Sequence, residues 1–411
     1  MLGVGFVFLV AEGVTGLLMA TELARPGVGF LGTSRYLELL SDHGAAATTL
    51  SLWPLGLGLA LTRVRLHPSA WLVVAAGAAS ILAGGALEFA ASHEIEIVGF
   101  GWTSYAPNPS PRSIEHLIHQ YALGTGLGLL GVVLATAPLA PAVRRGSPFA
   151  AAAAGAALAL PFPMITWFRA AAGSSWETPQ HVTFLALALT LLGATAEALG
   201  GVPRLYFVSV ATFVPVAGVV SIAHAAGTPI GDGNREDAVL GAPVACTLAT
   251  ILFAFAVSRR RRSAPGLFAA AALLQLLAAG MLGTILAASD PLRHRGDTQL
   301  VNAHLHFALL GFGLCALLAL AHARWPRLDE RAAAAGLGLL VAGTAVLSVA
   351  EAVAGNRRMP RRVSDYAPMF GGENLAAAIG GGLTALAVLV LAGNAFAAAR
   401  ASRFPNPRLR S

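Results

Sequence analysis

Three histidines lie at the ends of apolar stretches, where few polar side chains are expected. His304 and His306 belong to the run Asn-Ala-His-Leu-His-Phe, and His43 opens another apolar stretch. Each residue of a helix turns by about 100°, so His304 and His306 point about 200° apart and cannot bind one metal together. They can instead bind two hemes on opposite faces of one helix, each through an axial imidazole. His43 could supply the second axial ligand to one of these hemes.

A second pair of histidines indicates a further metal. His181 begins one apolar stretch and His224 ends the next. If these stretches are antiparallel neighbours, both imidazoles lie near the same membrane face and could hold a metal such as copper. His116 and His119 are three residues apart and share a helix face, where we expect packing or hydrogen bonding rather than catalysis.

The composition indicates which elements position these histidines. Hydrophobic residues make up 56% of the 411 residues and charged residues only 11%, with a mean hydropathy of +0.69. A soluble chain normally carries about 25% charged residues, so most of this chain should face lipid. About 20 apolar residues cross a bilayer as a helix, and a helix satisfies its own backbone hydrogen bonds there.

Apolar stretches separated by short polar segments predict about twelve transmembrane helices in an all-α, polytopic membrane protein. We expect one transmembrane heme-binding domain over residues 1–411. Pro161 and Pro163 weaken the fifth span near its end, because proline interrupts a helix. The expected spans are 2–23, 43–62, 69–91, 115–138, 148–167, 180–201, 204–226, 237–258, 265–288, 300–322, 332–355 and 375–398.

The net charge of +7 comes from arginines in short clusters between spans, and the chain has no lysine. This distribution favours the positive-inside pattern over nucleic-acid binding. It predicts a cell (cytoplasmic) membrane protein with both termini in the cytoplasm. One arginine cluster, around Arg361 and Arg362, lies in a loop expected on the outer side of the membrane. Because this breaks the positive-inside pattern, we expect a local anionic partner there.

Several motifs together resemble subunit I of the heme–copper oxidases. The pair Asp297-Thr298 before the Ala-His-Leu-His-Phe run is similar to the family's helix-ten motif, and the Met-Pro-Arg-Arg run at 359–362 is similar to its Met-Pro-Arg-Arg loop. Asp42-His43-Gly44 falls where the family has its helix-two heme histidine. Further similar segments, in chain order over nearly all the sequence, are 21–27, 101–107 and 280–287.

The resemblance implies a role for each matching residue. His43 and His306 would be the axial ligands of a low-spin heme, and His304 the proximal ligand of a high-spin heme. The resemblance further implies that Arg361 and Arg362 pair with heme propionates, that Trp102 and Asp297 line the outer region above the hemes, and that His181 and His224 are copper ligands.

Departures from the family concern the chemistry rather than the scaffold. The family has two adjacent histidines on helix seven, whereas Ala225 follows His224 here. The family's helix-six tyrosine falls at Leu185, and the absence of lysine removes one known proton channel. Two imidazoles leave copper with too few ligands, unless Glu177 or water adds another. The expected cofactors are therefore two hemes of unknown type, with one copper only if this site is completed.

The resemblance implies a cytochrome c oxidase-like oxidoreductase that passes electrons from the low-spin to the high-spin heme and reduces oxygen. Three alternatives stay open: a nitric oxide reductase-like enzyme, a diheme electron-transfer or sensor subunit without the binuclear metal, and a transporter or structural subunit with vestigial motifs. The chain has no cysteine-rich copper site for receiving electrons. Expected partners are other oxidase subunits, with a subunit II-like protein or cytochrome c as donor, and oxygen or another small diatomic gas.

Overall fold

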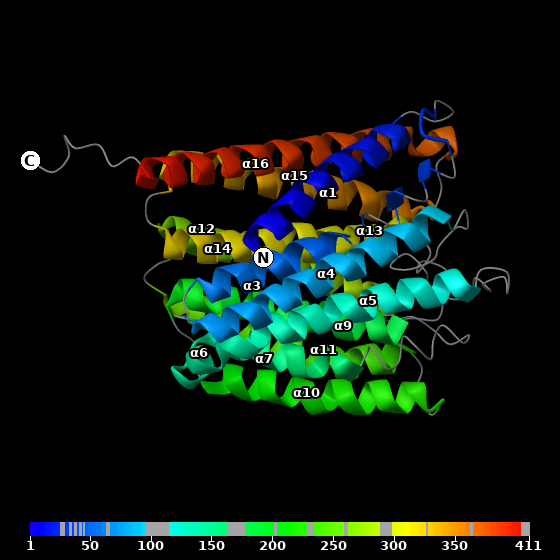
Figure 1. Cartoon of the computed structure of the whole chain (residues 1–411). Helices are drawn as coiled ribbons and strands as arrows, with labels where there is room; N and C mark the ends of the chain where they lie inside the picture. The colour runs from blue at the N-terminus through cyan, green and yellow to red at the C-terminus, as the bar shows by residue number, and fades with distance from the viewer. Residues whose placement is uncertain are drawn as a thin grey trace, which may run out of the picture.

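The computed structural model describes an all-helical arrangement (Figure 1). Its described residues are 1–24, 29–32, 35–36, 39–40, 43, 46–62, 66–94, 115–162, 177–200, 204–227, 233–258, 262–287, 298–325, 328–361 and 365–403. Within these ranges there is no β-strand, only an isolated bridge between Thr298 and Pro360. The helices are α1 (Leu2–Leu23), η1 (Ala46–Leu52), α3 (Trp53–Leu61), α4 (Pro68–Glu94), α5 (Glu115–Thr136), η4 (Ala137–Leu139), α6 (Ala140–Arg144), α7 (Pro148–Ala159), α9 (Glu177–Leu199), α10 (Arg204–Ala225), α11 (Gly233–Val257), α12 (Ala264–Ala287), α13 (Gln299–Leu305), η7 (His306–Gly313), α14 (Leu314–Arg324), α15 (Glu330–Asn356), η8 (Pro368–Phe370) and α16 (Gly371–Arg403).

The prediction of a polytopic helical membrane protein is confirmed. Ten helical segments in the described part of the chain are long and apolar enough to cross a membrane, and two shorter apolar helices occupy the second and fifth expected spans. The fifth span is short because α7 ends at Ala159, just before Pro161, as the sequence predicts. The helices run roughly along one common direction in Figure 1, as the spans of a membrane bundle do.

Glycines allow the closest helix pairs to approach. A Cβ on Gly131 would lie 2.7 Å from the Ile81 side chain, so α4 and α5 pack almost backbone to backbone. At Gly343 a Cβ would lie 2.5 Å from Oγ1 of Thr384, which holds α15 and α16 together in the same way. Such small residues are typical of helix contacts in membranes, where apolar burial alone gives no driving force.

Two expected spans are not uniform α-helices. The tenth consists of α13, the π-helical turn η7 and α14, and η7 begins at His306. The second contains the π-helical segment η1, which begins three residues after His43. Single π-helical turns inside α-helices often mark functional sites, because they rotate the side chains that follow. Both π-helical segments lie next to a histidine that the sequence singled out.

The helices that carry these histidines come together on one side of the bundle. Figure 1 places α1, α15 and α16 side by side, and α1 also packs against η1. The α13 helix packs between α12 and α15. At the N-terminal end of α13, the backbone N–H of Gln299 donates to the carbonyl of Met359 over 3.0 Å. This bond fixes α13 against the segment that follows α15.

Candidate heme site

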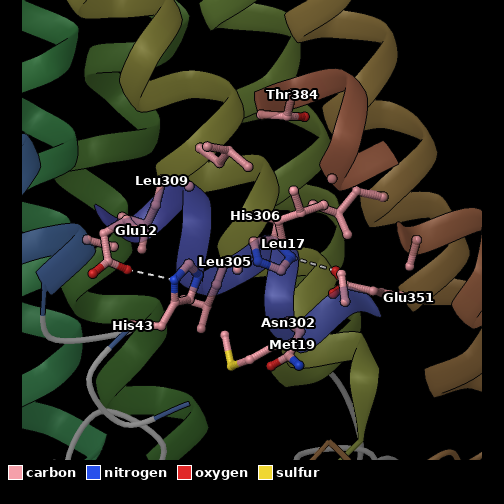
Figure 2. A pocket seen from close by; sticks show the side chains of 18 of the residues that line it. Glu12, Leu17, Met19, His43, Asn302, Leu305, His306, Leu309, Glu351 and Thr384 are labelled. Carbon is pink, nitrogen blue, oxygen red and sulfur yellow. Dashed lines mark hydrogen bonds and ion pairs between the residues drawn. The ribbon is translucent and has the colours of Figure 1, made fainter. Parts of the chain in front are cut away.

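A cavity of about 220 Å³ lies where α1, η1, α13, η7, α15 and α16 meet. Most of its lining is aliphatic, with polar side chains at a few points (Figure 2). Among the polar residues are His43 and His306, which come from sequence segments more than 250 residues apart. An apolar cavity with a few convergent polar groups is the usual form of a cofactor site.

His43 reaches this cavity and contacts a carboxylate. Its Nδ1 atom lies 2.6 Å from Oε2 of Glu12, a residue of α1 that is 7% exposed. Gly16, one turn further along α1, allows the imidazole to lie against the helix, because a Cβ there would be 3.1 Å from Cε1 of His43. The carboxylate and the glycine together fix the position of the His43 ring.

His306 is held in the same manner from the other side. Its Nδ1 atom lies 2.7 Å from Oε2 of Glu351 on α15, and this carboxylate is also buried. Because a carboxylate accepts the hydrogen bond, the imidazole carries its proton on Nδ1, and Nε2 is available as a metal ligand. Figure 2 shows both histidine–glutamate contacts, with the two rings between the two carboxylates.

The spacing of the two rings fits one iron between them. Their centroids are 6.5 Å apart with an interplanar angle of 61°. Because bonds from a metal to an imidazole nitrogen are about 2 Å long, two imidazoles on opposite sides of one metal have centroids roughly 6 Å apart. The donor set, the spacing and the apolar lining therefore fit a heme with two axial imidazoles.

The end of the cavity near Arg361 carries polar groups. Arg361 is 2% exposed and is the one cation among the described residues that line the cavity. Gln299, Asn302 and Asn374 also line it, and the amide of Asn302 donates to Oε1 of Gln299 over 2.8 Å. A buried guanidinium favours an anionic partner such as a carboxylate. Tyr366, in the segment after α15, donates its hydroxyl to the carbonyl of Leu23 at the end of α1.

His304 faces the opposite side of the same helix, as its spacing from His306 predicts. Its Nδ1 donates to the carbonyl of Ala279 on α12 over 2.8 Å. A Cβ on Gly283, one turn further along α12, would lie 3.0 Å from Cε1 of His304. The ring is therefore oriented by α12 and does not line the cavity that holds His306.

His224 contacts a carboxylate on the neighbouring helix. The Nδ1 atom of His224 lies 3.1 Å from Oε2 of Glu236, a residue of α11 that is 1% exposed. No group of three histidine, cysteine or acidic side chains that could hold a metal occurs among the residues the structure describes. The assignment of copper to His181 and His224 stays a prediction.

Three site residues expected from the sequence, Trp102, Asp297 and Arg362, lie outside the described residues, as do the side chains of His116, His119 and Glu177. Sequence reasoning missed Glu12 and Glu351. A signal was present, because each is an acidic residue within a long apolar span, and ionisable residues at such positions are costly and usually functional.

Comparisons with known proteins agree with this geometry. The sequence profile of the family described as "Cytochrome C and Quinol oxidase polypeptide I" matches residues 206–383, which include His304, His306 and Arg361. A probable cytochrome c oxidase subunit 1-beta of Nocardia farcinica is 24% identical over 95% of this chain and 76% of its own length. The chain is therefore similar to cytochrome c oxidase subunit I over most of its length, at low identity.

Two further oxidase subunits show a similar degree of likeness. Cytochrome c oxidase subunit 1 of Bacillus sp. strain PS3 is 25% identical over 94% of this chain and 72% of its own length. A putative cytochrome c oxidase subunit 1-beta of Streptomyces coelicolor is 26% identical over 94% of this chain and 78% of its own length. Because they cover 94–95% of this chain, these matches extend beyond the profile match to the second span, which carries His43.

Proposed function

We propose that this chain is the heme-carrying membrane subunit of a respiratory oxidase-like complex, which passes electrons from a low-spin to a high-spin heme and reduces oxygen. The observation that carries the proposal is the pair His43 and His306, facing each other across a buried cavity with each Nδ1 directed to a carboxylate. Similarity to an oxidoreductase family supports the same assignment.

In this proposal His43 and His306 hold the low-spin heme through their Nε2 atoms. A heme with two axial protein ligands supplies one-electron transfer, because no coordination position is open for a substrate. The aliphatic lining excludes water from this heme, and Arg361 binds a propionate at its end of the cavity. Arg362 has the same proposed role.

His304 would hold the high-spin heme on the other face of α13. Its Nδ1–H donates a hydrogen bond to the Ala279 carbonyl, so Nε2 would be the nitrogen that binds the iron. Since His304 lies near the end of α13 and His306 begins η7, two residues apart, this continuous helical segment would place both hemes close to one another for electron transfer. The gas would bind on the side of this heme that His304 does not occupy.

The proposal includes partners and a location. Electrons enter from another subunit of the complex, either a subunit II-like protein or a cytochrome c, because this chain has no cysteine-rich copper site of its own. The chain forms a single transmembrane domain in the cytoplasmic membrane with both termini inside.

One alternative has a specific observation in its favour. Ala225 stands where the family has a second helix-seven histidine, and Leu185 where it has a tyrosine, so the expected copper site lacks residues that the family uses. A chain without this metal would act as a diheme electron-transfer or sensor subunit. It would still use His43, His306 and His304 as proposed.

Heme and metal content of the purified protein tests the proposal. We expect two hemes per chain, with a reduced-minus-oxidised spectrum in which carbon monoxide shifts the signal of one heme. A stoichiometric copper or iron beyond the hemes would support oxygen reduction, whereas two hemes without a third metal would favour the electron-transfer subunit. Absence of heme in a folded protein would contradict both.

A further inference from the structure

Two buried carboxylates contact the two histidines of the cavity. Glu12 on α1 and Glu351 on α15 are 7% and 9% exposed, and each has an oxygen within 2.7 Å of an Nδ1 atom. Acidic side chains within a membrane are costly and are kept where they serve a function. Because the two glutamates lie on opposite sides of one cavity, we infer that they serve the cavity rather than helix packing.

The contact of His306 with Glu351 is a hydrogen bond, and that of His43 with Glu12 is an ion pair; each acts on the imidazole as a ligand. An imidazole that donates its Nδ1–H to a carboxylate gains negative character and becomes a more basic ligand through Nε2. A more basic axial ligand stabilises ferric iron relative to ferrous iron. Hydrogen bonding to the axial ligands is one of the means by which a protein sets a heme's reduction potential.

The charge around the cavity acts in the same direction. The charged residues among its described lining are Glu12, Glu351 and the single cation Arg361. Apart from its propionates, a heme carries one more positive charge when oxidised than when reduced. Negative groups nearby therefore favour the oxidised form, and the low dielectric of a buried site strengthens the effect.

We propose that Glu12 and Glu351 are positioning residues that orient the two axial imidazoles and hold the low-spin heme at a low reduction potential. This inference rests on the proposed function, in which His43 and His306 bind that heme. At a low potential the heme gives up its electron readily, so the donor that reduces this chain must itself have a low potential.

Redox titration of the low-spin heme in purified Glu12→Gln and Glu351→Gln proteins tests the inference. Glutamine keeps the size of the side chain and removes its charge. Each variant should shift the equilibrium toward the reduced heme by about tenfold, which is about 59 mV for a one-electron couple. The matched control is Glu88→Gln, a buried carboxylate of α4 that binds Thr125 and does not line the cavity; it should leave the potential unchanged.

Electron paramagnetic resonance of the oxidised proteins gives a second readout. Histidines with imidazolate character give a smaller g anisotropy than neutral imidazoles at the same ring orientation, so each glutamine variant should show a larger anisotropy than the unmutated protein. Unchanged potentials and unchanged anisotropy in both glutamine variants would overturn the inference while leaving the low-spin heme in place. A folded protein without any low-spin heme would overturn the proposed function as well.

Discussion

At the scale of residues, the positions of two of the three histidines depend on small neighbours as much as on polar ones. His43 lies against Gly16 of α1, and His304 lies against Gly283 of α12, with no room for a Cβ at either glycine without movement of the ring. Since a metal bond requires the ligand nitrogen to be correctly placed, these glycines belong to the candidate site although they carry no chemistry.

Gly283→Ala is expected to disturb the heme bound by His304. The added methyl would lie 3.0 Å from Cε1 of the imidazole and displace the ring by a few tenths of an ångström. We expect a smaller carbon monoxide-binding signal per chain with an unchanged low-spin heme signal, measured by difference spectroscopy.

Gly280→Ala is the matched control for this variant. Gly280 lies one turn away on the same helix, and a Cβ added there would have no other atom within 4 Å. An equal loss of carbon monoxide binding in both variants would indicate a general effect on α12 rather than on His304.

At the scale of elements, the end of α15 shows a local departure from backbone preference. The helix closes with hydrogen bonds from Arg358 N–H to Gly355 and from Met359 N–H to Ala354, a turn that places Arg358 at φ 68°. Glycine is usual at this position, because a Cβ is unfavourable in the left-handed region. The turn leads directly to Arg361 at the cavity.

Arg358→Gly should therefore stabilise the protein by about 1 kcal/mol. The side chain is exposed, so little packing is lost. Thermal unfolding in detergent, followed by loss of helical circular dichroism, measures the change. Arg358→Ala keeps the Cβ and should show no such gain; equal stabilisation by alanine would mean that the arginine charge, not the backbone, is unfavourable.

The close contact between α15 and α16 likewise depends on single residues. A Cβ on Gly380 would overlap the backbone of Leu347 and lie 2.7 Å from the Gly343 carbonyl oxygen. Gly380→Ala should lower the free energy of unfolding by about 1–3 kcal/mol, because the two helices must separate. Gly382→Ala, which has open space around it, should be neutral in the same unfolding measurement. Equal stability of the two variants would contradict the close packing of this helix pair.

At the scale of the whole molecule, the surface is that of a protein in lipid. Large apolar side chains point outward along most spans, as at Leu72, Phe253 and Phe396, while several glutamates are buried inside. This inversion of the soluble pattern agrees with ten membrane-length helices among the described residues. The arginines then determine which end of the bundle faces the cytoplasm.

Reporter fusions test the proposed orientation. A fluorescent protein at the C-terminus should fluoresce, because it folds in the cytoplasm, and alkaline phosphatase inserted between α4 and α5 should be active, because that segment is expected outside. The reverse pattern would invert the topology and place Arg361 and its end of the cavity on the cytoplasmic side.

The sequence by itself determined the helical membrane fold and the three heme-binding candidates, because both depend on local information. Apolar length defines a span, and the spacing of His304 and His306 on one helix defines opposite faces. The end of α7 was equally predictable, since Pro161 and Pro163 lie close together just after it and proline removes a helix hydrogen bond.

Only the tertiary structure decided what each histidine meets. Glu12, His43, His306 and Glu351 lie on four different segments, and no periodicity relates their positions in the chain. Their contacts exist because glycine-mediated packing brings α1, α13 and α15 to one cavity. The π-helical turn at His306 and the contact of His224 with Glu236 were likewise outside the reach of the sequence, since both depend on neighbouring helices rather than on local propensity.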